Sequence, residues 1–231
     1  MPLKQTLVLG VLMGTATFNA NAASLSPYSV NGVNLVYSGD HNISWTQDAN
    51  LFKTMYDADN TLISQITNIT PSYNDPLLGL QTIDDNPQSG FDDFDTTTGR
   101  MSWWGGIAFF NYLNNIAYGG SNQWRLPSFS EFNSLFYNEL GGTFMNSIPD
   151  TVDFINEQAF SYWEFAPEAN IAPFFNARIG SGGQGFRSSL AYAWAVSPGQ
   201  VNVSVSEPGV MWLLLTGLLG LLGLKRRGQS G

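Results

Sequence analysis

The most specific stretch of this sequence is Gly119-Gly120-Ser121-Asn122-Gln123-Trp124-Arg125-Leu126-Pro127-Ser128-Phe129-Ser130-Glu131-Phe132. Ser128 and Glu131 have the spacing of a capping box, in which the Ser128 hydroxyl accepts from the Glu131 amide and the Glu131 carboxylate accepts from the Ser128 amide. Pro127 blocks any helix that arrives from upstream. Residues 124–127 are therefore expected to form a short rigid segment that directs a helix.

The helix that follows this cap is predicted from apolar spacing. The apolar residues at helical intervals are Phe129, Phe132, Leu135, Phe136 and Leu140. Gly141-Gly142 is expected to end the helix. Upstream of the cap, Arg125 lies between Trp124 and Leu126, which indicates a partly buried side chain. A buried charge without a partner is costly, so we expect Arg125 to pair with a carboxylate or carbonyl as a structural clamp, with ligand contact as the alternative.

The composition bounds both the class and the partners of the protein. The chain has 231 residues, of which 43% are hydrophobic and 14% aromatic, as in a folded domain. Basic residues gather at the two ends: Lys4 near the N-terminus and Lys225, Arg226 and Arg227 near the C-terminus. Without these four and Glu207, the body carries five basic and 17 acidic residues, a net charge of about −12. This charge argues against nucleic acid and anionic lipid as partners and permits cations.

Cysteine and histidine usage excludes several kinds of site. The chain has no cysteine, which excludes disulfides, zinc–thiolate centres and cysteine nucleophiles. Its single histidine is His41, so a serine triad would have to use that residue and a site of several histidines is impossible.

Both ends of the chain resemble targeting segments. Residues 1–22 predict a secretory signal peptide: Lys4 precedes an apolar run at 7–14, and Ala20-Asn21-Ala22 is a cleavage motif, an uncleaved anchor being the alternative. Residues 206–231 contain Ser206-Glu207-Pro208, an apolar run at 210–224 predicted to be helical, and a basic end at 225–227. The apolar run is short for a bilayer span of about 20 residues. The basic end is expected to stay cytoplasmic, which places the body outside.

Between these ends, residues 23–205 are expected to form one domain of mixed structure. Residues 24–80 predict short strands and turns, with an Asn-Gly hairpin at Val30-Asn31-Gly32-Val33 and a strand at 42–48. A helix is predicted over 98–118, with Trp103 and Trp104 in the core. Further strands are predicted at 162–165, 174–179 and 192–196, and the glycine-rich residues 180–185 are expected to form a flexible loop.

An acidic, turn-rich segment is the candidate metal site. Its five aspartates are Asp84, Asp85, Asp92, Asp93 and Asp95. Hard oxygen ligands of this kind suit calcium, which is the one cofactor the sequence suggests, if the loop folds back on itself. An exposed, solvated loop is the alternative. A pair such as Asp92 and Asp95 could also serve glycoside hydrolysis, but nothing in the spacing favours that use.

The tail resembles the PEP-CTERM sorting signal of Gram-negative bacteria. Ser206-Glu207-Pro208, the apolar run and Lys225-Arg226-Arg227 carry the resemblance, although the first proline of the motif is missing. The resemblance implies an exported precursor held in the inner membrane, recognition by an exosortase-type membrane protease as partner, and a final location at the cell surface or in the medium. Proteins with this signal often accompany exopolysaccharide production.

The body is similar to Lcl C-terminal-like domains, a bacterial family of unknown function. The matching segments are Trp45-Thr46-Gln47, the Trp104 helix, Trp124-Arg125-Leu126-Pro127 with Glu131-Phe132, and residues 192–199. Where the family usually has Trp-Ser-Ser, this chain has Trp163-Glu164-Phe165. The resemblance implies an α+β fold of the C-type-lectin-like kind, with two helices against a small twisted antiparallel sheet and long loops. Fold analogy alone does not give function.

Together these features predict an exported, non-enzymatic domain of the cell envelope or extracellular matrix. Its expected partner besides the protease is an extracellular polysaccharide, because exposed aromatic rings and polar side chains suit sugars. Two alternatives stay open: a structural matrix component without a discrete ligand site, and a hydrolase that acts on glycans.

Overall fold

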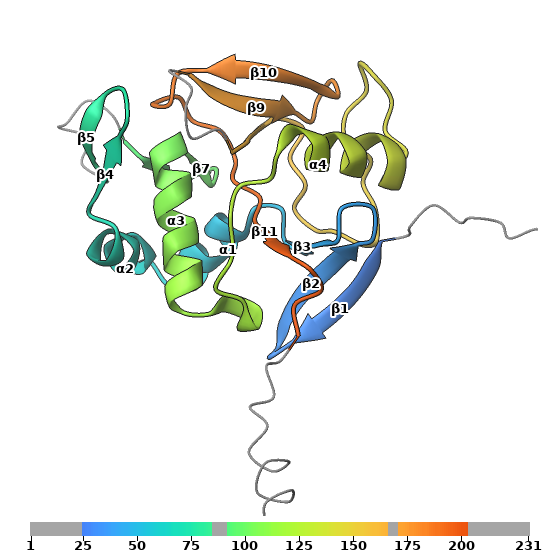
Figure 1. Ribbon diagram of the computed structural model, residues 1–231, viewed down its shortest axis with the longest axis horizontal. Coiled ribbons are helices and arrows are strands. Elements are labelled where there is room, and N and C mark those ends of the chain that lie inside the picture. The colour runs from blue at the N-terminus through green and yellow to red at the C-terminus, as the bar shows by residue number, and fades with distance from the viewer. Residues whose placement is uncertain (1–24, 85–91, 166–170, 203–231) are drawn as a thin grey trace, which may run out of the picture.

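The computed structural model describes residues 25–84, 92–165 and 171–202 (Figure 1). They form a mixed α+β structure of small antiparallel sheets and short helices. Both segments that resemble targeting signals lie outside the described residues. Among the helices that are described, none is long and apolar enough to cross a bilayer.

The first sheet begins with the predicted Asn-Gly hairpin. Strand β1 (Ser26–Val30) pairs antiparallel with β2 (Val33–Ser38). The turn places Asn31 at φ 51° and Gly32 at φ 77°, the left-handed conformations that a tight hairpin turn requires. Strand β3 (Ile43–Thr46) and the distant β11 (Val196–Pro198) complete the order β1-β2-β3-β11. The hairpin prediction is confirmed, and β3 lies within the predicted strand at 42–48.

Two helices replace part of the predicted strand-and-turn region. Helix α1 (Leu51–Ala58) and helix α2 (Leu62–Ile69) follow Asn50 and Thr61, residue types that are common at N-caps, but neither side chain makes a capping hydrogen bond. Helix α2 buries Leu62, Ile63 and Ile66, and its main neighbour is α3. The expectation of short strands and turns over 24–80 is therefore wrong at 51–58 and 62–69, where each helix is only eight residues long and depends on tertiary packing.

Two small hairpins connect these helices to α3. The first pairs β4 (Ser72–Asp75) with β5 (Gly79–Thr82). The second pairs β6 (Phe94–Asp95) with β7 (Arg100–Met101). The first residues of the helix predicted at 98–118 belong instead to this second hairpin.

The central helix α3 (Trp103–Asn115) begins after the Ser102 cap. Trp103 and Trp104 are both buried, as predicted. A Cβ on Gly105 would lie 2.6 Å from the Asp93 carbonyl oxygen, so this glycine admits a close neighbour. Helix η1 (Tyr118–Gly120) then leads toward the Trp-Arg-Leu-Pro segment.

The helix predicted after the cap is present in two parts. Helix α4 (Phe129–Ser134) continues as a π-helical turn, η2 (Leu135–Glu139), and Gly141 follows at φ 69°. Phe132, Leu135 and Phe136 are buried as the apolar spacing indicates, whereas Phe129 is 49% exposed.

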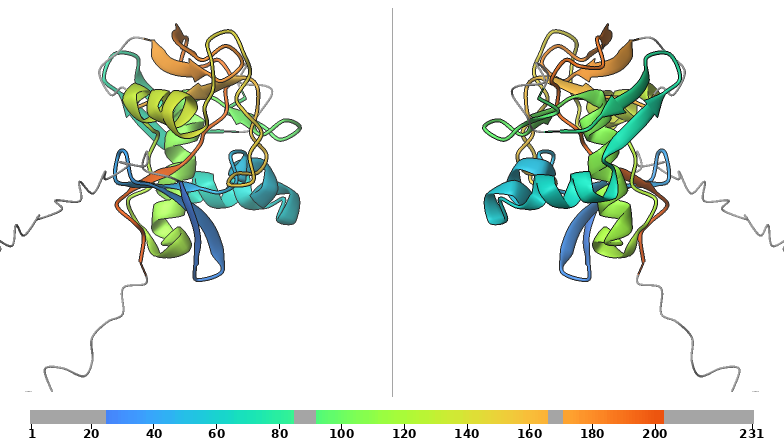
Figure 2. Two further views of the ribbon diagram at one scale, coloured as in Figure 1. Left: turned by 90° about the vertical axis from the view of Figure 1, so that its right-hand side faces the viewer. Right: turned by 90° about the vertical axis from the view of Figure 1, so that its left-hand side faces the viewer.

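A second sheet lies at the end of the molecule away from the β1–β2 hairpin (Figures 1 and 2). It consists of β8 (Ser161–Trp163), β9 (Ala172–Asn176) and β10 (Ser181–Gly185), in the order β10-β9-β8. Strand β10 is the segment predicted to be a flexible loop, and that prediction is wrong. Its glycines are required because Cβ atoms on Gly182 and Gly183 would collide with the rings of Phe129 and Phe174.

The predicted strand at 192–196 is displaced. Tyr192 makes only an isolated bridge, to Tyr162, and the regular strand starts at Val196. Large and small side chains alternate along this segment because it lies between two apolar cores. Ala193 and Ala195 pack into the core around α3, whereas Trp194 and Val196 pack into the core beneath α4.

Candidate functional site

The predicted capping box is present and is joined to Arg125. The Ser128 hydroxyl accepts from the Glu131 amide, and the Glu131 carboxylate accepts from the Ser128 amide at 2.7 Å. The Arg125 guanidinium donates to both Glu131 carboxylate oxygens, at 2.9 and 2.7 Å. Burial alone would raise the pKa of Glu131, but the bonds from Arg125 and Ser128 hold it below its usual value. Arg125 is thus the structural clamp that the sequence predicts.

The clamp also attaches the segment to the first sheet. The backbone of Arg125 exchanges two hydrogen bonds with Val196, at 2.9 and 3.0 Å. Trp124 and Leu126 are buried on either side. Pro127 then accepts a hydrogen bond at 3.0 Å from the amide of Phe165, just beyond β8. The segment therefore fixes the start of α4 beside the second sheet.

Phe129 is the residue that this arrangement places over the sheet. Its ring lies against Gly182 of β10 and 6.3 Å from the ring of Phe175. Because Gly182 has no side chain, Phe129 packs directly on the strand backbone. About half of its surface is still exposed, so the ring forms a partly open apolar platform.

Beside this platform, one row of residues crosses the three strands. Pro173 and Gln184 are register partners, and the Glu164 amide donates to the Pro173 carbonyl at 3.0 Å. This row and Phe129 border a hollow of about 500 Å³, whose described lining is Phe129, Glu164, Pro173, Gly182, Gly183 and Gln184. We call this hollow the β10 groove.

Glu164 is the unusual group of the β10 groove. Its side chain is 3% exposed, and its Oε1 has no hydrogen-bond partner among the described residues. Burial raises the pKa of Glu164 to about 7. A buried, unpartnered carboxyl group that borders an open hollow is available to a ligand, and near neutral pH it can accept or donate a proton.

The described elements around Glu164 offer it no free charged partner. Strands β9 and β10 contain no titratable residue, and Glu131, the acid of α4, is paired with Arg125. On β8, burial raises the pKa of Tyr162 above the usual tyrosine value, so its hydroxyl stays neutral. Behind Glu164, its carbonyl accepts from the Trp103 indole at 3.0 Å. None of these described groups offsets the charge that Glu164 acquires on ionisation.

A buried ion pair lies beside Trp103, whose indole donates to the Glu164 carbonyl. Arg187 and Asp75, with side chains only 1% and 0% exposed, form a salt bridge. The Arg187 guanidinium lies 4.3 Å from the centre of the Trp103 ring. Burial opposes ionisation of Asp75, but hydrogen bonds from the Trp104 indole, two backbone amides and Arg187 lower its pKa to about 2. The sequence gives no signal for this pair, because its members are far apart in the chain.

The acidic segment does not gather its described carboxylates into one site. Asp93 is buried and accepts from the Ser102 hydroxyl and, at 3.1 Å, from the Asp84 amide. Asp95 accepts from the amides of Thr97 and Thr98 and pairs with Arg100 at 3.1 Å.

Of the other acidic residues of this segment, only some are described. Asp92 is exposed, and Asp85 lies outside the described residues. Within the described ranges, no group of three acidic or histidine side chains could hold a metal ion. The calcium site therefore gains no support from the described part of the chain.

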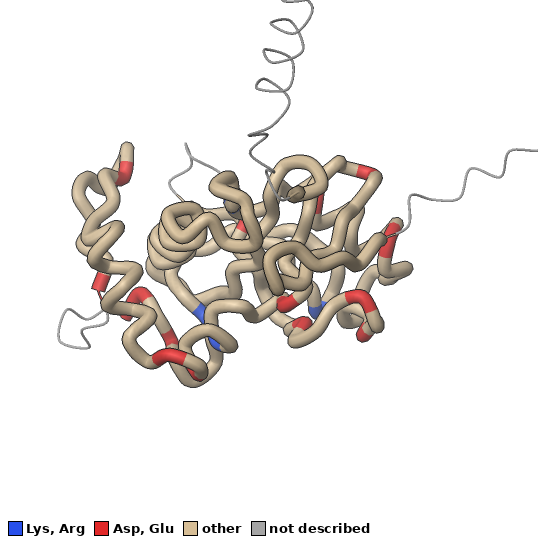
Figure 3. Tube along the Cα trace, turned by 90° about the horizontal axis from the view of Figure 1, so that it is seen from below, with Lys and Arg blue, Asp and Glu red and all other residues tan. Residues whose placement is uncertain are grey.

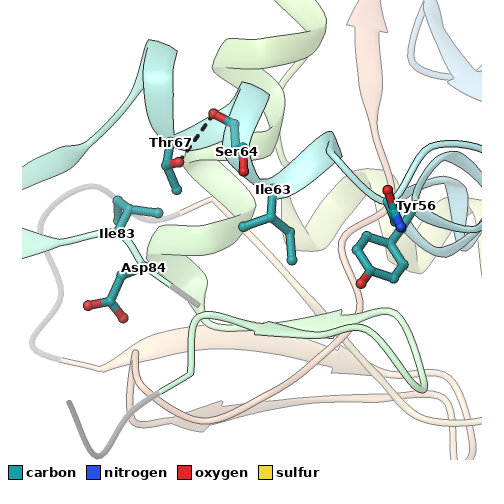
Figure 4. A pocket seen from close by; sticks show the side chains of 7 residues that line it. Tyr56, Ile63, Ser64, Thr67, Ile83 and Asp84 are labelled. Atoms are coloured by element: carbon teal, nitrogen blue, oxygen red, sulfur yellow. Dashed lines mark hydrogen bonds between the residues drawn. The ribbon is translucent and has the colours of Figure 1, made fainter. Parts of the chain in front are cut away.

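A second hollow lies between the first helices and residues 83–84 (Figure 4). It measures about 320 Å³, and its lining is Tyr56, Asn60, Ile63, Ser64, Thr67, Ile83 and Asp84. The Thr67 hydroxyl donates to the Ser64 carbonyl at 3.3 Å, a bond within helix α2. Figure 4 shows the side chains that line the hollow, of which only Ile63 and Ile83 are buried, so none of its polar residues is a buried group. The β10 groove is therefore the stronger candidate.

The sequence pattern does not identify the β10 groove as a site. Trp163-Glu164-Phe165 departs from the pattern of the similar family, and the one available signal is a charged residue between two aromatic residues in a predicted strand. The sorting residues Ser206, Glu207, Pro208, Lys225, Arg226 and Arg227 lie outside the described residues. Comparison with protein families, curated proteins and solved structures finds no match to this chain.

Proposed function

We propose that this protein is an exported cell-envelope or matrix protein whose body binds an extracellular glycan in the β10 groove. The observation that carries the proposal is the buried Glu164 carboxyl group, whose Oε1 has no hydrogen-bond partner among the described residues and which lines the same groove as the half-exposed ring of Phe129. An aromatic ring stacks on the apolar face of a sugar, while carboxyl and amide groups bond to its hydroxyls. Gln184 supplies the amide at the other side of the row.

Binding without hydrolysis fits the lining of the groove. Glycoside hydrolysis ordinarily uses two carboxyl groups, about 5 to 10 Å apart. Of the described residues that line the groove, Glu164 alone carries a carboxyl group. We therefore propose a binding role for Glu164, in which its carboxyl group forms hydrogen bonds with the ligand.

The finer classification of the fold is part of the same proposal. We propose a C-type-lectin-like arrangement, supported by α3 and by α4 with its continuation η2, which pack beside small antiparallel sheets. Long connections, such as residues 140–160 between η2 and β8, fit that architecture.

Export and sorting are proposed from the two ends of the chain. The mature protein should begin near Ala23, which N-terminal sequencing of exported protein will establish. Replacing Lys225, Arg226 and Arg227 by neutral residues should impair sorting by an exosortase-type protease, because these charges set the topology. Unchanged location and mature mass in that variant would contradict the sorting proposal.

The binding proposal is tested by titrating the purified protein with neutral, anionic and cationic oligosaccharides in a calorimeter. At least one class should bind, and Phe129→Ala should weaken that binding by about tenfold, because the ring supplies the stacking surface. Phe144→Ala is the matched control, since Phe144 is 62% exposed and does not line the groove. Equal effects of the two variants, or no binding by any class, would contradict the proposal.

A further inference from the structure

We propose that the ligand of the β10 groove is a glycan with free amino groups. An ammonium group of this glycan forms an ion pair with Glu164, and the sugar ring that carries it stacks on Phe129. This inference rests on the proposed glycan-binding function and narrows it to cationic amino sugars. It follows from three features of the structure: the Glu164 Oε1, which has no hydrogen-bond partner among the described residues, the charge of the body, and the presence of both Glu164 and Phe129 in the lining of one groove.

The first feature is the need of Glu164 for a donor. Its Oε1 is buried and has no hydrogen-bond partner in the described part of the chain, which is a costly state for a polar atom and more so for an ionised one. A ligand hydroxyl would relieve the missing hydrogen bond, but an ammonium group relieves both the missing bond and the uncompensated charge. Charge-assisted hydrogen bonds are about twice as strong as neutral ones. The site therefore favours a cationic donor over a neutral one.

The second feature is the electrostatic character of the whole body. Its five basic residues are outnumbered by 17 acidic ones. Four of the five, Lys53, Arg100, Arg125 and Arg187, already form salt bridges, and none of the five lines the groove. Figure 3 shows acidic positions distributed around the trace and few basic ones. A cationic polymer is attracted to such a surface, whereas an anionic one is repelled.

The third feature separates an amino sugar from a lysine side chain. Phe129 and Glu164 are parts of one lining, which also includes Gly182 and Gly183 of β10. In an amino sugar the ammonium is attached directly to the ring, so stacking and ion pairing occur within one rigid unit. A lysine ammonium lies at the end of a flexible chain, and ordering that chain costs entropy.

The test compares two oligosaccharides of equal length: an oligomer of glucosamine and the same oligomer with every amine acetylated. At about pH 6.5, the glucosamine oligomer should bind the wild-type protein at least about tenfold more tightly. Glu164→Gln should remove that preference, whereas Asp150→Asn, which removes an exposed charge, should keep it. Binding should also release a proton in the wild type, measured as a difference in heat between two buffers, and not in Glu164→Gln.

The outcomes distinguish this inference from the function on which it rests. If both oligomers bind equally and Phe129→Ala weakens both, the groove binds glycans but the amino-sugar inference is wrong. If neither oligomer nor any other glycan binds, the proposed function itself fails. If a lysine oligomer binds more tightly than the glucosamine oligomer, the ligand is a basic polypeptide and the amino-sugar inference is wrong.

Discussion

Glu164→Gln is predicted to change how the stability of the protein depends on pH. Burial raises the pKa of Glu164 from an ordinary 4.5 to about 7 in the folded protein. Each tenfold difference in proton affinity corresponds to about 1.4 kcal/mol, so the ionised Glu164 destabilises the fold by about 3 kcal/mol at high pH. Glutamine has nearly the same shape and carries no charge at any pH.

The sign of the effect follows from which state binds the proton. Below about pH 4.5, Glu164 is protonated in both the folded and the unfolded chain and contributes no pH dependence. Between pH 4.5 and about 7, the unfolded chain ionises first, so unfolding releases a proton and stability falls as pH rises. Above about pH 7, the free energy of unfolding stays lower by the full amount. Glu139, whose pKa burial also raises to about 7, adds a slope of the same sign.

The assay is urea unfolding of the wild type and of Glu164→Gln at pH 5 and pH 8. Relative to the wild type, the variant should gain about 2 to 3 kcal/mol more at pH 8 than at pH 5. The comparison between the two pH values removes any packing change, because such a change does not depend on pH. Asp150→Asn should show no such difference, since Asp150 is exposed. Parallel pH profiles of wild type and Glu164→Gln would refute the account of a buried, unpartnered carboxyl group.

Three further substitutions test the framework around the groove. Arg187→Met should destabilise the fold by about 3 to 5 kcal/mol, because it leaves a buried aspartate without its partner; a melting temperature near that of wild type would contradict the buried pair. Arg125→Ala should cost about 2 kcal/mol by the same measurement, less than Arg187→Met because Arg125 is 36% exposed, and an equal or larger loss would reverse that ranking. Gly182→Ala should displace the Phe129 ring, because the new Cβ would lie 2.8 Å from it, and should weaken glycan binding more than it lowers stability; unchanged affinity would show that the ring position does not matter.

Local chemistry explains which elements could be predicted from the sequence. The Ser128–Glu131 cap and the Asn31-Gly32 turn each depend on residues within a few positions, so their patterns predict them correctly. At the starts of α1 and α2, Asn50 and Thr61 make no capping hydrogen bond, and the two helices are stabilised by distant neighbours, which short-range patterns do not contain.

The candidate site depends on contacts that the sequence does not display. Strand β10 is rich in glycine because two aromatic rings occupy the space of its missing side chains, whereas glycine-rich segments usually predict a loop. The exposure of Phe129 and the burial of Glu164 result from how α4 meets the second sheet, and neither follows from helical or strand periodicity. A charged residue in an aromatic strand was the only local sign of the groove.

The most direct test of the central claim is to map ligand contacts on the isotopically labelled protein by nuclear magnetic resonance. On titration with a glucosamine oligomer, the account predicts that backbone amide shifts concentrate at Gly182, Gly183, Gln184 and Glu164 and that Phe129→Ala reduces them. Shifts that concentrate instead around Tyr56 and the second hollow, or that spread evenly over the acidic surface, would contradict the claim that the β10 groove is the binding site.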